Sequence, residues 1–362
     1  MDFGLSEEQE LLAETLGRYL DESVSPARVR EIASSETGHA EEVWKSLAEM
    51  GIAGILIDEE YGGSGLGLLD AVVASEVLGY HATPAPFLSA VMAAVALARG
   101  GTPAARKQWL PRIAAGERGL SLAVGERVSK REGAGVRIEK GRLVGKALFA
   151  LDATSASGFL VAVDDGRIAI VAGDADGLSV EPLATIDPTR RTAEIVLEGV
   201  EVEEWLGDES GTLVDLVINV GRVILAADIL GASQRSLDLA VAYAGERKQF
   251  ERVIGSFQAV KHLCSEMAAE IEPARALLWY AGHAFDEDSG EASLMSAHAK
   301  AHLAEVGRFV VRTATEVHGG IGFTEECDVQ LFFKRVGLDR ILLGSPEQVR
   351  EYAARLQGWL AA

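Results

Sequence analysis

Two stretches in the C-terminal half carry residue types that bind phosphates and aromatic rings. The first, residues 247–262 (RKQFERVIGSFQAVKH), contains the guanidinium of Arg247, the ring of Phe250 and the amide of Gln258. A guanidinium offers a fork of donors that suits a pyrophosphate, and the ring and amide suit an adenosine moiety. The second stretch (HGGIGFT) begins at His318 at the end of a long helical run, where glycines let the backbone approach a phosphate or a ring closely. Each stretch alone is also compatible with a simple helix end, but together they indicate a binding surface.

Other candidate motifs are weaker. Residues 61–67 (YGGSGLG) are glycine-rich, but no strand-to-helix phosphate loop frames them and no P-loop lysine is present, which favours a surface loop. His298 and His302 have a helical spacing that can bind zinc, yet no acidic or cysteine ligands accompany them, so we expect no metal site. No serine–histidine–aspartate pattern with a nucleophile elbow is present. Cys264 and Cys327 cannot build a disulfide framework and are expected to be buried free thiols.

Composition narrows the possible partners. The chain has 362 residues, 48% of them hydrophobic and 25% charged, with a formal net charge of −21. Such acidity argues against nucleic acid and against anionic membranes. Residues 212–232 approach the length of a membrane span, but Asp215, Arg222 and Asp228 interrupt them, which favours a core helix. Residues 1–5 lack the basic and apolar segments of a signal peptide, so we expect a cytoplasmic protein that binds neither nucleic acid nor membrane.

The elements that position these residues follow from hydrophobic periodicity. Helical spacing holds from residue 6 to about 119, beginning with a capping box of Ser6 and Gln9 and a predicted apolar face of Leu11, Leu12, Leu16 and Leu20. Prolines at 84 and 86 precede another predicted helix, residues 88–98.

The period shortens to that of strands between about residues 121 and 205. Residues 159–163 and 167–171 are predicted strands joined by a hairpin at 164–166 (DDG), and residues 194–198 form a further strand. After residue 211 the helical pattern returns and holds to the C-terminus.

With these elements in place, the chain resembles the acyl-CoA dehydrogenase family along nearly its whole length. The matching stretches begin at residues 5, 47, 75, 187, 247 and 316: LSEEQELLAETLGRYL, LAEMGIAGILIDEEYGGSGLG, SEVLGYHATPAPFLSAV, DPTRRTAEIVLEGV, RKQFERVIGSFQAVKH and EVHGGIGFT. The resemblance implies an α+β, mainly α fold. Its expected domains are an N-terminal helical domain (1–120), a middle β-barrel-like domain (121–205) and a C-terminal four-helix bundle (206–362). It also implies FAD as cofactor, an acyl-CoA substrate that loses hydrogens from its α and β carbons, and an electron-transferring flavoprotein as acceptor.

The sequence departs from the family at the catalytic base. The family glutamate that precedes Gly-Thr near the C-terminus corresponds to Leu343, and the alternative position before Arg222 is Gly221. Neither side chain can accept a proton, so we expect no catalytic residue in this chain. Arg222 matches a family arginine near the CoA cleft, which makes it a candidate substrate-binding residue. A homotetramer that recruits another base, Asp339 or Glu347, is the alternative.

The flavin-binding motifs are only half kept. Family members hold the flavin of their own subunit with two segments of the β domain, and the matching residues 122–127 (LAVGER) and 146–151 (KALFAL) do not resemble them. The retained residues correspond to those that hold the FAD of a neighbouring subunit: Arg247, Phe250, Gln258, Glu316, Gly319 and Gly320. Glu316 stands where the family has glutamine, and a carboxylate there repels a pyrophosphate unless it is protonated or paired.

This asymmetry predicts a heteromer. We expect a homologous catalytic subunit in an α2β2 tetramer that shares FAD with this chain, as in actinobacterial enzymes of which several act on steroid side-chain or other bulky acyl-CoAs. A structural pseudoenzyme without FAD contact is a further alternative.

Overall fold

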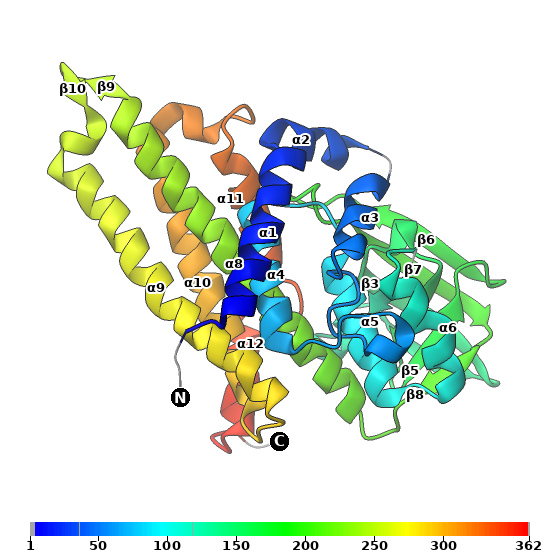
Figure 1. Ribbon diagram of the computed structural model, residues 1–362. Helices are drawn as coiled ribbons and strands as arrows, with labels where there is room; N and C mark the ends of the chain where they lie inside the picture. Colours follow the sequence, from blue (N-terminus) through cyan, green and yellow to red (C-terminus); the bar gives the residue numbers. More distant parts are fainter. Residues whose placement is uncertain (1–3, 36, 118, 361–362) are drawn as a thin grey trace. The chain divides into compact units, whose positions relative to one another are not determined.

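Helices, then strands, then helices follow one another along the chain, as the periodicity predicts. The computed structural model describes residues 4–35, 37–117 and 119–360 (Figure 1), so residues 1–3, part of the segment assessed for a signal peptide, lie outside it. Close contacts divide the chain into two compact units made of discontinuous stretches. Unit 1 comprises Met1–Arg30, Val72–Thr83 and Val223–Ala362, and unit 2 comprises Glu31–Ala71 and Pro84–Arg222. The three-domain division at residues 120 and 205 stays a prediction.

Unit 1 is a set of packed helices. Its elements are α1 (Glu7–Ser23), most of α4 (Leu68–Tyr80), most of α8 (Thr212–Glu246), α9 (Gln258–Asp286), α10 (Ala292–His318), η4 (Gly319–Phe323), α11 (Val329–Asp339) and α12 (Pro346–Leu356). A short turn joins α8 to α9 and consists of β9 (Lys248–Gln249), β10 (Arg252–Val253) and η3 (Ile254–Ser256). It forms the tip at which α8 and α9 meet in Figure 1. The helix α2 (Pro26–Ser34) begins in unit 1 and ends in unit 2.

The start of α1 confirms the predicted capping box. The Ser6 side chain accepts from the Gln9 amide, and the Gln9 side chain accepts from the Ser6 amide. Leu16 and Leu20 are fully buried, but the prediction was wrong for Leu11, which is 62% exposed. Leu12, Leu16 and Leu20 repeat every four residues on one side of the helix, whereas Leu11 is rotated about 100° from Leu12.

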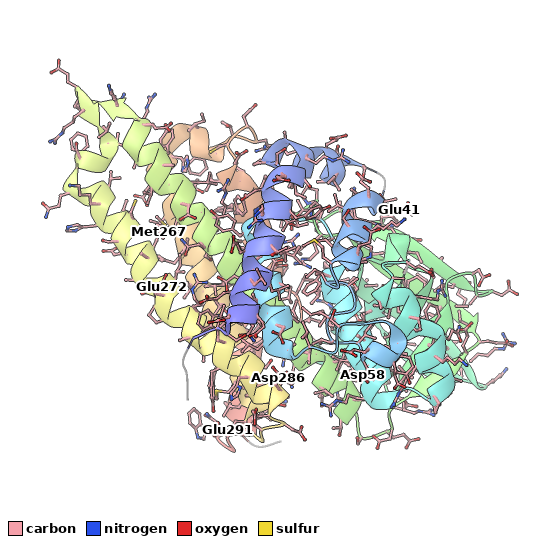
Figure 2. The ribbon with its side chains drawn as sticks, viewed as in Figure 1. Glu41, Asp58, Met267, Glu272, Asp286 and Glu291 are labelled. Carbon is pink, nitrogen blue, oxygen red and sulfur yellow. The ribbon has the colours of Figure 1, made fainter. Side chains whose placement is uncertain are left out.

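Close packing of α4 and α8 depends on two glycines. A Cβ atom on Gly79 would overlap the carbonyl of Asp228, and one on Gly231 would overlap the carbonyl of Glu76. The two backbones are therefore in direct contact. The longer helix α9 has the usual two faces, shown in Figure 2 by buried Met267 and exposed Glu272.

Unit 2 combines helices with one large sheet. Its helices are α3 (Glu41–Glu49), η1 (Glu59–Tyr61), α5 (Phe87–Gly100), α6 (Pro103–Ala114), α7 (Gly125–Val128) and η2 (Ala153–Ser155). The strands are β1 (Leu120–Ala123), β2 (Gly135–Glu139), β3 (Arg142–Leu151), β4 (Gly158–Ala162), β5 (Ile168–Ala172), β6 (Leu178–Leu183), β7 (Thr192–Val200) and β8 (Glu204–Leu206). Their order is β6-β7-β3-β1-β4-β5-β8 with β2 on β3; β1 and β4 pair in parallel, and the other pairings between the described strands are antiparallel.

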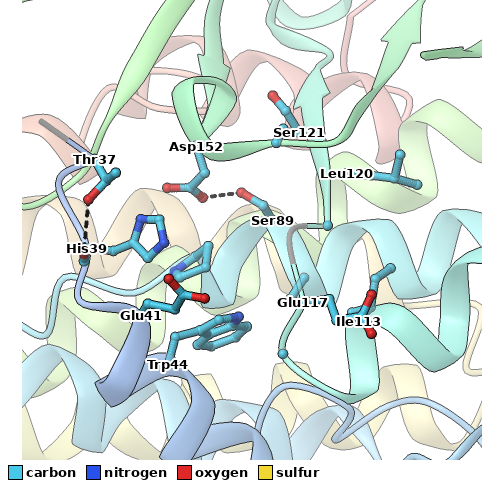
Figure 3. Close-up of a pocket in the computed structure, with 15 residues that line it drawn as sticks. Thr37, His39, Glu41, Trp44, Ser89, Ile113, Glu117, Leu120, Ser121 and Asp152 are labelled. Carbon is cyan, nitrogen blue, oxygen red and sulfur yellow. Dashed lines mark hydrogen bonds between the residues drawn. The ribbon is translucent and has the colours of Figure 1, made fainter. Parts of the chain in front are cut away.

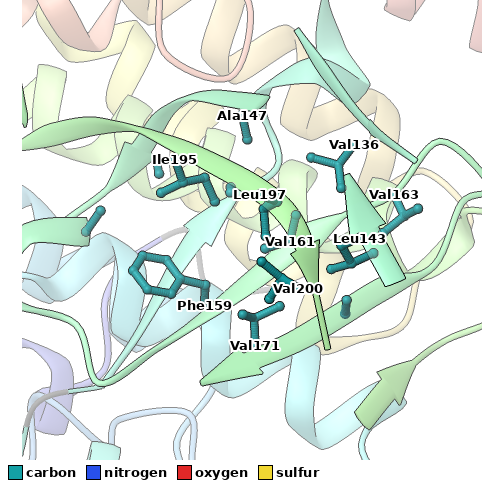
Figure 4. Packing of buried hydrophobic residues seen from close by; sticks show 14 of the residues in the cluster. Val136, Leu143, Ala147, Phe159, Val161, Val163, Val171, Ile195, Leu197 and Val200 are labelled. Carbon is teal, nitrogen blue, oxygen red and sulfur yellow. The ribbon is translucent and has the colours of Figure 1, made fainter. Parts of the chain in front are cut away.

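The predicted hairpin, the strand at 194–198 and the helix after the prolines are all confirmed. The β4–β5 hairpin turns at Gly166, which has a positive φ of 94°. Inward-facing apolar side chains from several strands make the core of the sheet, with Phe159, Val161 and Ile195 among them (Figure 4). The glycine-rich stretch 61–67 is a surface loop, as expected.

The apolar stretch 212–232 is part of α8, which confirms the predicted core helix, since both Arg222 and Asp228 are buried in it. Within the ranges given above, no helix is long and apolar enough to cross a membrane. The prediction of buried thiols was wrong in degree: Cys264 and Cys327 are both free but only half-buried. Cys264 lies on a partly exposed side of α9. Hydrophobic periodicity alone predicts the exposure of such a boundary position only approximately.

Candidate functional site

The turn between α8 and α9 presents three of the predicted binding residues. Arg247 follows the end of α8, Phe250 is at the hairpin tip with 86% of its surface exposed, and Gln258 begins α9. Phe250 and Glu251 have positive φ angles of 51° and 65°, as a two-residue hairpin turn of type I′ requires. The ladder closes where the Ile254 amide donates to the Arg247 carbonyl at 2.8 Å. The turn is therefore ordered by its own backbone.

Aromatic contacts stiffen the same turn. The Arg252 guanidinium lies 4.0 Å from the centre of the Phe257 ring, and Phe250 meets that ring edge-on at 6.1 Å. The exposed Arg247 guanidinium, in contrast, has no side-chain partner among the residues that the structure describes. The N–H groups of the Arg247 guanidinium are therefore available to a hydrogen-bond acceptor of a ligand or of another chain.

The second predicted stretch lies beside the first in unit 1. The His318 ring stacks on Tyr243 of α8, with centroids 4.6 Å apart, and its Nδ1 lies 2.7 Å from the Ala314 carbonyl. This stack joins the C-terminal ends of α8 and α10, so it brings Gly319 and Gly320 toward the Arg247 turn. A Cβ atom on either glycine would meet nothing within 4 Å. Gly319 needs its positive φ of 67°, but nothing inside the chain requires glycine at 320.

Local charge distinguishes this surface, which we call the α8–α10 end surface and which comprises residues 247–258 and 316–323. This surface contains three lysines and arginines and two glutamates, Glu251 and Glu316, in a chain whose net charge is −21. Phe323 and Ile321 are 77% and 51% exposed beside it. Glu316 is exposed on the last turn of α10, so solvent screens its charge. Exposed cations next to exposed apolar side chains suit an anionic ligand covered by another protein surface.

A groove of about 900 Å³ runs between α8 and α9 directly below this turn. Its walls are mainly apolar and include Val241, Val253 and Val260, with Lys261 and Cys264 on the α9 side. Burial raises the pKa of the Cys264 thiol above its ordinary value. The groove is an open apolar surface next to the predicted binding residues, and it holds no catalytic pair.

The position at which the sequence predicts the loss of the base is buried and apolar. Leu343 is 7% exposed and has a φ of +55°, a conformation that branched apolar residues rarely adopt. Glu347 begins the exposed start of α12, where the hydrogen bond with Ser345, the largest cause, and the local backbone lower its pKa. A lowered pKa makes Glu347 a weak base. Asp339 is fully buried, with its Oδ2 3.7 Å from Arg335 Nε. Neither environment suits a catalytic base, as the predicted alternative with a recruited carboxylate requires.

Gly221 and Arg222 belong to unit 2 and are both buried on α8. The Arg222 guanidinium donates to the Asn219 side chain at 2.9 Å, one turn earlier on the same helix. A helix-internal contact of this kind gives Arg222 a structural role, and its role in substrate binding stays a prediction.

A pocket of unit 2 lies between α3, α5, α6 and β1 and has a volume of about 150 Å³ (Figure 3). His39, Glu41 and Asp152 line it, and the Ser89 hydroxyl donates to Asp152. The serine hydroxyl thus pairs with a carboxylate and not with a histidine, unlike the serine–histidine pair of an activated serine nucleophile. His298 is half-buried and His302 exposed on α10, and the described ranges contain no cluster of three or more residues that could hold a metal.

Sequence reasoning missed a buried ionic network in unit 1. Arg335 of α11 donates to both carboxylate oxygens of Asp228 on α8, at 2.9 and 2.8 Å. The ammonium of Lys300, fully buried on α10, donates to the carbonyls of Asp339 and Arg340 at 2.7 and 3.0 Å. The signals available were charged residues within apolar helical stretches, Asp228 in residues 212–232 and Lys300 in α10. This network holds the segment that leads to Leu343.

Comparisons with known proteins agree with this architecture. The family model described as acyl-CoA dehydrogenase, N-terminal domain, matches residues 6–117, and the one described as acyl-CoA dehydrogenase, C-terminal domain, matches residues 212–357. The chain is 33% identical over 359 residues to acyl-CoA dehydrogenase IpdE2 of Mycolicibacterium smegmatis, covering 97% of this chain and 100% of the relative.

Solved structures give the same fold. The chain resembles one in the ChsE4–ChsE5 complex from Mycobacterium tuberculosis with a TM-score of 0.91 and 28% identity, covering all of both chains. It also resembles a chain in a variant of the Tcur3481–Tcur3483 steroid ACAD with a TM-score of 0.89 and 29% identity, covering 98% of each. The expected mainly helical fold with a central sheet is confirmed, and this chain belongs to the acyl-CoA dehydrogenase family.

Proposed function

We propose that this chain is the non-catalytic subunit of a heteromeric acyl-CoA dehydrogenase and supplies the trans half of the partner's FAD site. The observation that carries the proposal is the combination of two features of unit 1. The α8–α10 end surface keeps its exposed guanidinium and open glycines, while the position of the base is occupied by buried Leu343.

The α8–α10 end surface fits part of a dinucleotide cofactor. Arg247 can pair with a pyrophosphate oxygen, and the start of α9 at Gln258 adds backbone amides and a favourable dipole. Phe250 offers an apolar face to an adenosine group, and the space in front of Gly319 and Gly320 is open. Bound FAD would supply the acceptor for hydride from the acyl β carbon, and this chain's residues would bind and orient its phosphate end.

The proton chemistry then belongs to another chain. Removal of an α proton needs a positioned base of suitable pKa. Here Leu343 cannot supply one, Glu347 is exposed with a lowered pKa, and Asp339 is buried beside Arg335. These environments disfavour the homotetrameric alternative, in which one of the two carboxylates would act.

The relatives support a paired assembly and a bulky substrate. One solved relative is named as a complex of ChsE4 with ChsE5, and another as a steroid ACAD of two named chains, Tcur3481 and Tcur3483. We therefore propose a homologous catalytic partner in an α2β2 tetramer, a steroid side-chain or other bulky acyl-CoA as substrate, an electron-transferring flavoprotein as acceptor and a cytoplasmic location.

Substitution of Arg247 tests the proposal. Arg247→Ala in the copurified complex should remove a charge-assisted pair worth about 1.5 to 3 kcal/mol, and weaken FAD affinity about tenfold to hundredfold. Excess FAD should restore activity, because the partner's base is untouched. Arg18→Ala is the matched control, since Arg18 is an exposed arginine of α1 that pairs with Glu14 on the same helix.

Two outcomes would contradict the proposal. If Arg247→Ala and Arg18→Ala complexes of equal assembly state bind FAD equally well, this surface does not contact the cofactor. If the chain purified alone carries one FAD per chain, the flavin site is not divided between subunits.

A further inference from the structure

Strand β3 contains a β-bulge at Leu148 and Phe149. The Leu148 amide and the Phe149 ring are therefore not part of the pairing with β7. The pairing of β3 with β7 shifts register between Ala147 and Ala150, so Leu148 and Phe149 lie outside the regular ladder. Phe149 has a φ of +57°, an uncommon conformation for a bulky residue. Bulges of this kind often occur beside functional sites, where they re-aim a side chain. The bulge therefore marks a candidate binding face at residues 148–149.

The chain covers this face with its own residues 125–131. Glu126 Oε1 accepts from the Leu148 amide at 3.0 Å. The Arg131 guanidinium lies 4.8 Å from the centre of the Phe149 ring. The two covering residues also interact, because Arg131 lies 3.5 Å from Glu126 Oε1. One segment thus supplies both an acceptor for the amide and a flat cation for the ring.

Burial of Glu126 makes this arrangement unusual for an ordinary turn. The residue is only 7% exposed, and within the described ranges its Oε2 has no hydrogen-bond partner. Burial is the largest influence on this carboxyl and raises its pKa, against the Leu148 amide and Arg131, which lower it. The hydrogen bond from the Leu148 amide, which the ladder to β7 does not use, offsets part of the cost of burying this carboxylate.

We propose that residues 125–131 form an internal plug, with Glu126 on the Leu148 amide and Arg131 on the Phe149 ring, which excludes planar heteroaromatic ligands from this chain's own β region. An acceptor atom on such a ligand would need the Leu148 amide, and its ring would need the face of Phe149. The plug deepens the proposed function, on which it rests, because it explains why this chain binds a flavin only through the α8–α10 end surface.

Riboflavin is the appropriate probe, because it carries the flavin ring without the phosphates and adenosine that Arg247 and Gln258 would hold. Binding to the full chain is measured by quenching of riboflavin fluorescence for wild type, Arg131→Ala, Glu126→Gln and Arg137→Ala. Arg137 is the matched control, an exposed arginine of β2 in the same sheet, paired with Glu139 at 2.6 Å.

Arg131→Ala should bind riboflavin about tenfold more tightly than wild type. The variant lacks the cation–π contact with Phe149 and the ion pair with Glu126, which compete with riboflavin for this face. Glu126→Gln should change affinity in the same direction, since it keeps the side-chain shape but removes the charge that retains Arg131. If circular dichroism shows that Arg131→Ala does not fold, Glu126→Gln alone tests the proposal. Arg137→Ala should match wild type.

Equal riboflavin affinity in folded Arg131→Ala, Glu126→Gln and Arg137→Ala chains would overturn the plug. That result would not contradict the proposed function, because the Arg247 experiment tests the α8–α10 end surface and not residues 125–131. Conversely, failure of the Arg247 experiment with success here would show that the plug exists without a trans site.

Discussion

Removing Arg335 should be one of the most damaging single changes in unit 1. Its guanidinium is 3% exposed and donates to both oxygens of Asp228, which is also almost fully buried. Arg335→Met keeps much of the volume but leaves the Asp228 charge buried without its cation. Breaking a buried pair in this way costs about 3 to 5 kcal/mol. A folded domain is stable by only about 5 to 15 kcal/mol, so about a fifth or more of the stability should be lost.

The measurement is the thermal midpoint of helical circular dichroism, where a loss of this size lowers the midpoint by on the order of 10 °C. Arg308→Met is the matched control, because Arg308 pairs with Glu305 on the surface of α10 with half of its side chain exposed. A surface pair contributes about 0 to 1 kcal/mol. Adding Asp228→Leu to Arg335→Met should recover part of the loss. Equal midpoints for Arg335→Met and Arg308→Met would refute the reasoning.

Three further outcomes are expected. Lys300→Met should lower the free energy of unfolding by about 2 to 4 kcal/mol, because the carbonyls of Asp339 and Arg340 lose their buried donor. A midpoint of urea unfolding equal to that of wild type would contradict this. Partial burial alone would raise the pKa of Glu305. Hydrogen bonds from Arg340 and Arg308 outweigh this effect and lower the pKa below its ordinary value. Glu305→Gln should therefore destabilise by at most about 1 kcal/mol at neutral pH, and the difference should disappear as the pH falls through the lowered pKa of the wild-type carboxyl, because that carboxyl is then protonated too; thermal midpoints across pH measure it, and a difference that persists in acid argues against it. Leu343→Glu should give the isolated chain no acyl-CoA turnover with an artificial acceptor, because a base without a bound flavin beside it has no hydride acceptor; measurable turnover would refute the assignment of a non-catalytic subunit.

Local features of the fold were predictable because the determining residues are neighbours in sequence. The Ser6–Gln9 capping box and the hairpin turn at Gly166 each depend on a few adjacent side chains and backbone angles. The exposed positions of Arg247 and Phe250 agree with a surface site, and their cofactor role stays a prediction.

The remaining features depend on distant pairings that periodicity does not encode. Asp228 and Arg335 are 107 positions apart, so their pairing follows only from the packing of α8 against α11. The bulge at Phe149 depends on the register between β3 and β7, which a run of apolar residues leaves open. The partial exposure of Cys264 reflects the groove beside it, a property of two helices together.

The backbone contact between α4 and α8 also restricts how this chain can diverge. Most apolar core positions accept a change of shape when their neighbours repack, so sequence drift there is gradual. Gly79 and Gly231 have no such freedom, because each faces a main-chain carbonyl, which cannot rotate away. Even alanine at either position would force the helices apart and disturb the buried ion pair that Asp228 makes one turn away from Gly231. Chains of this family are therefore expected to keep these two small residues even where other positions change, which makes them a marker of shared ancestry that does not depend on the chemistry of the site.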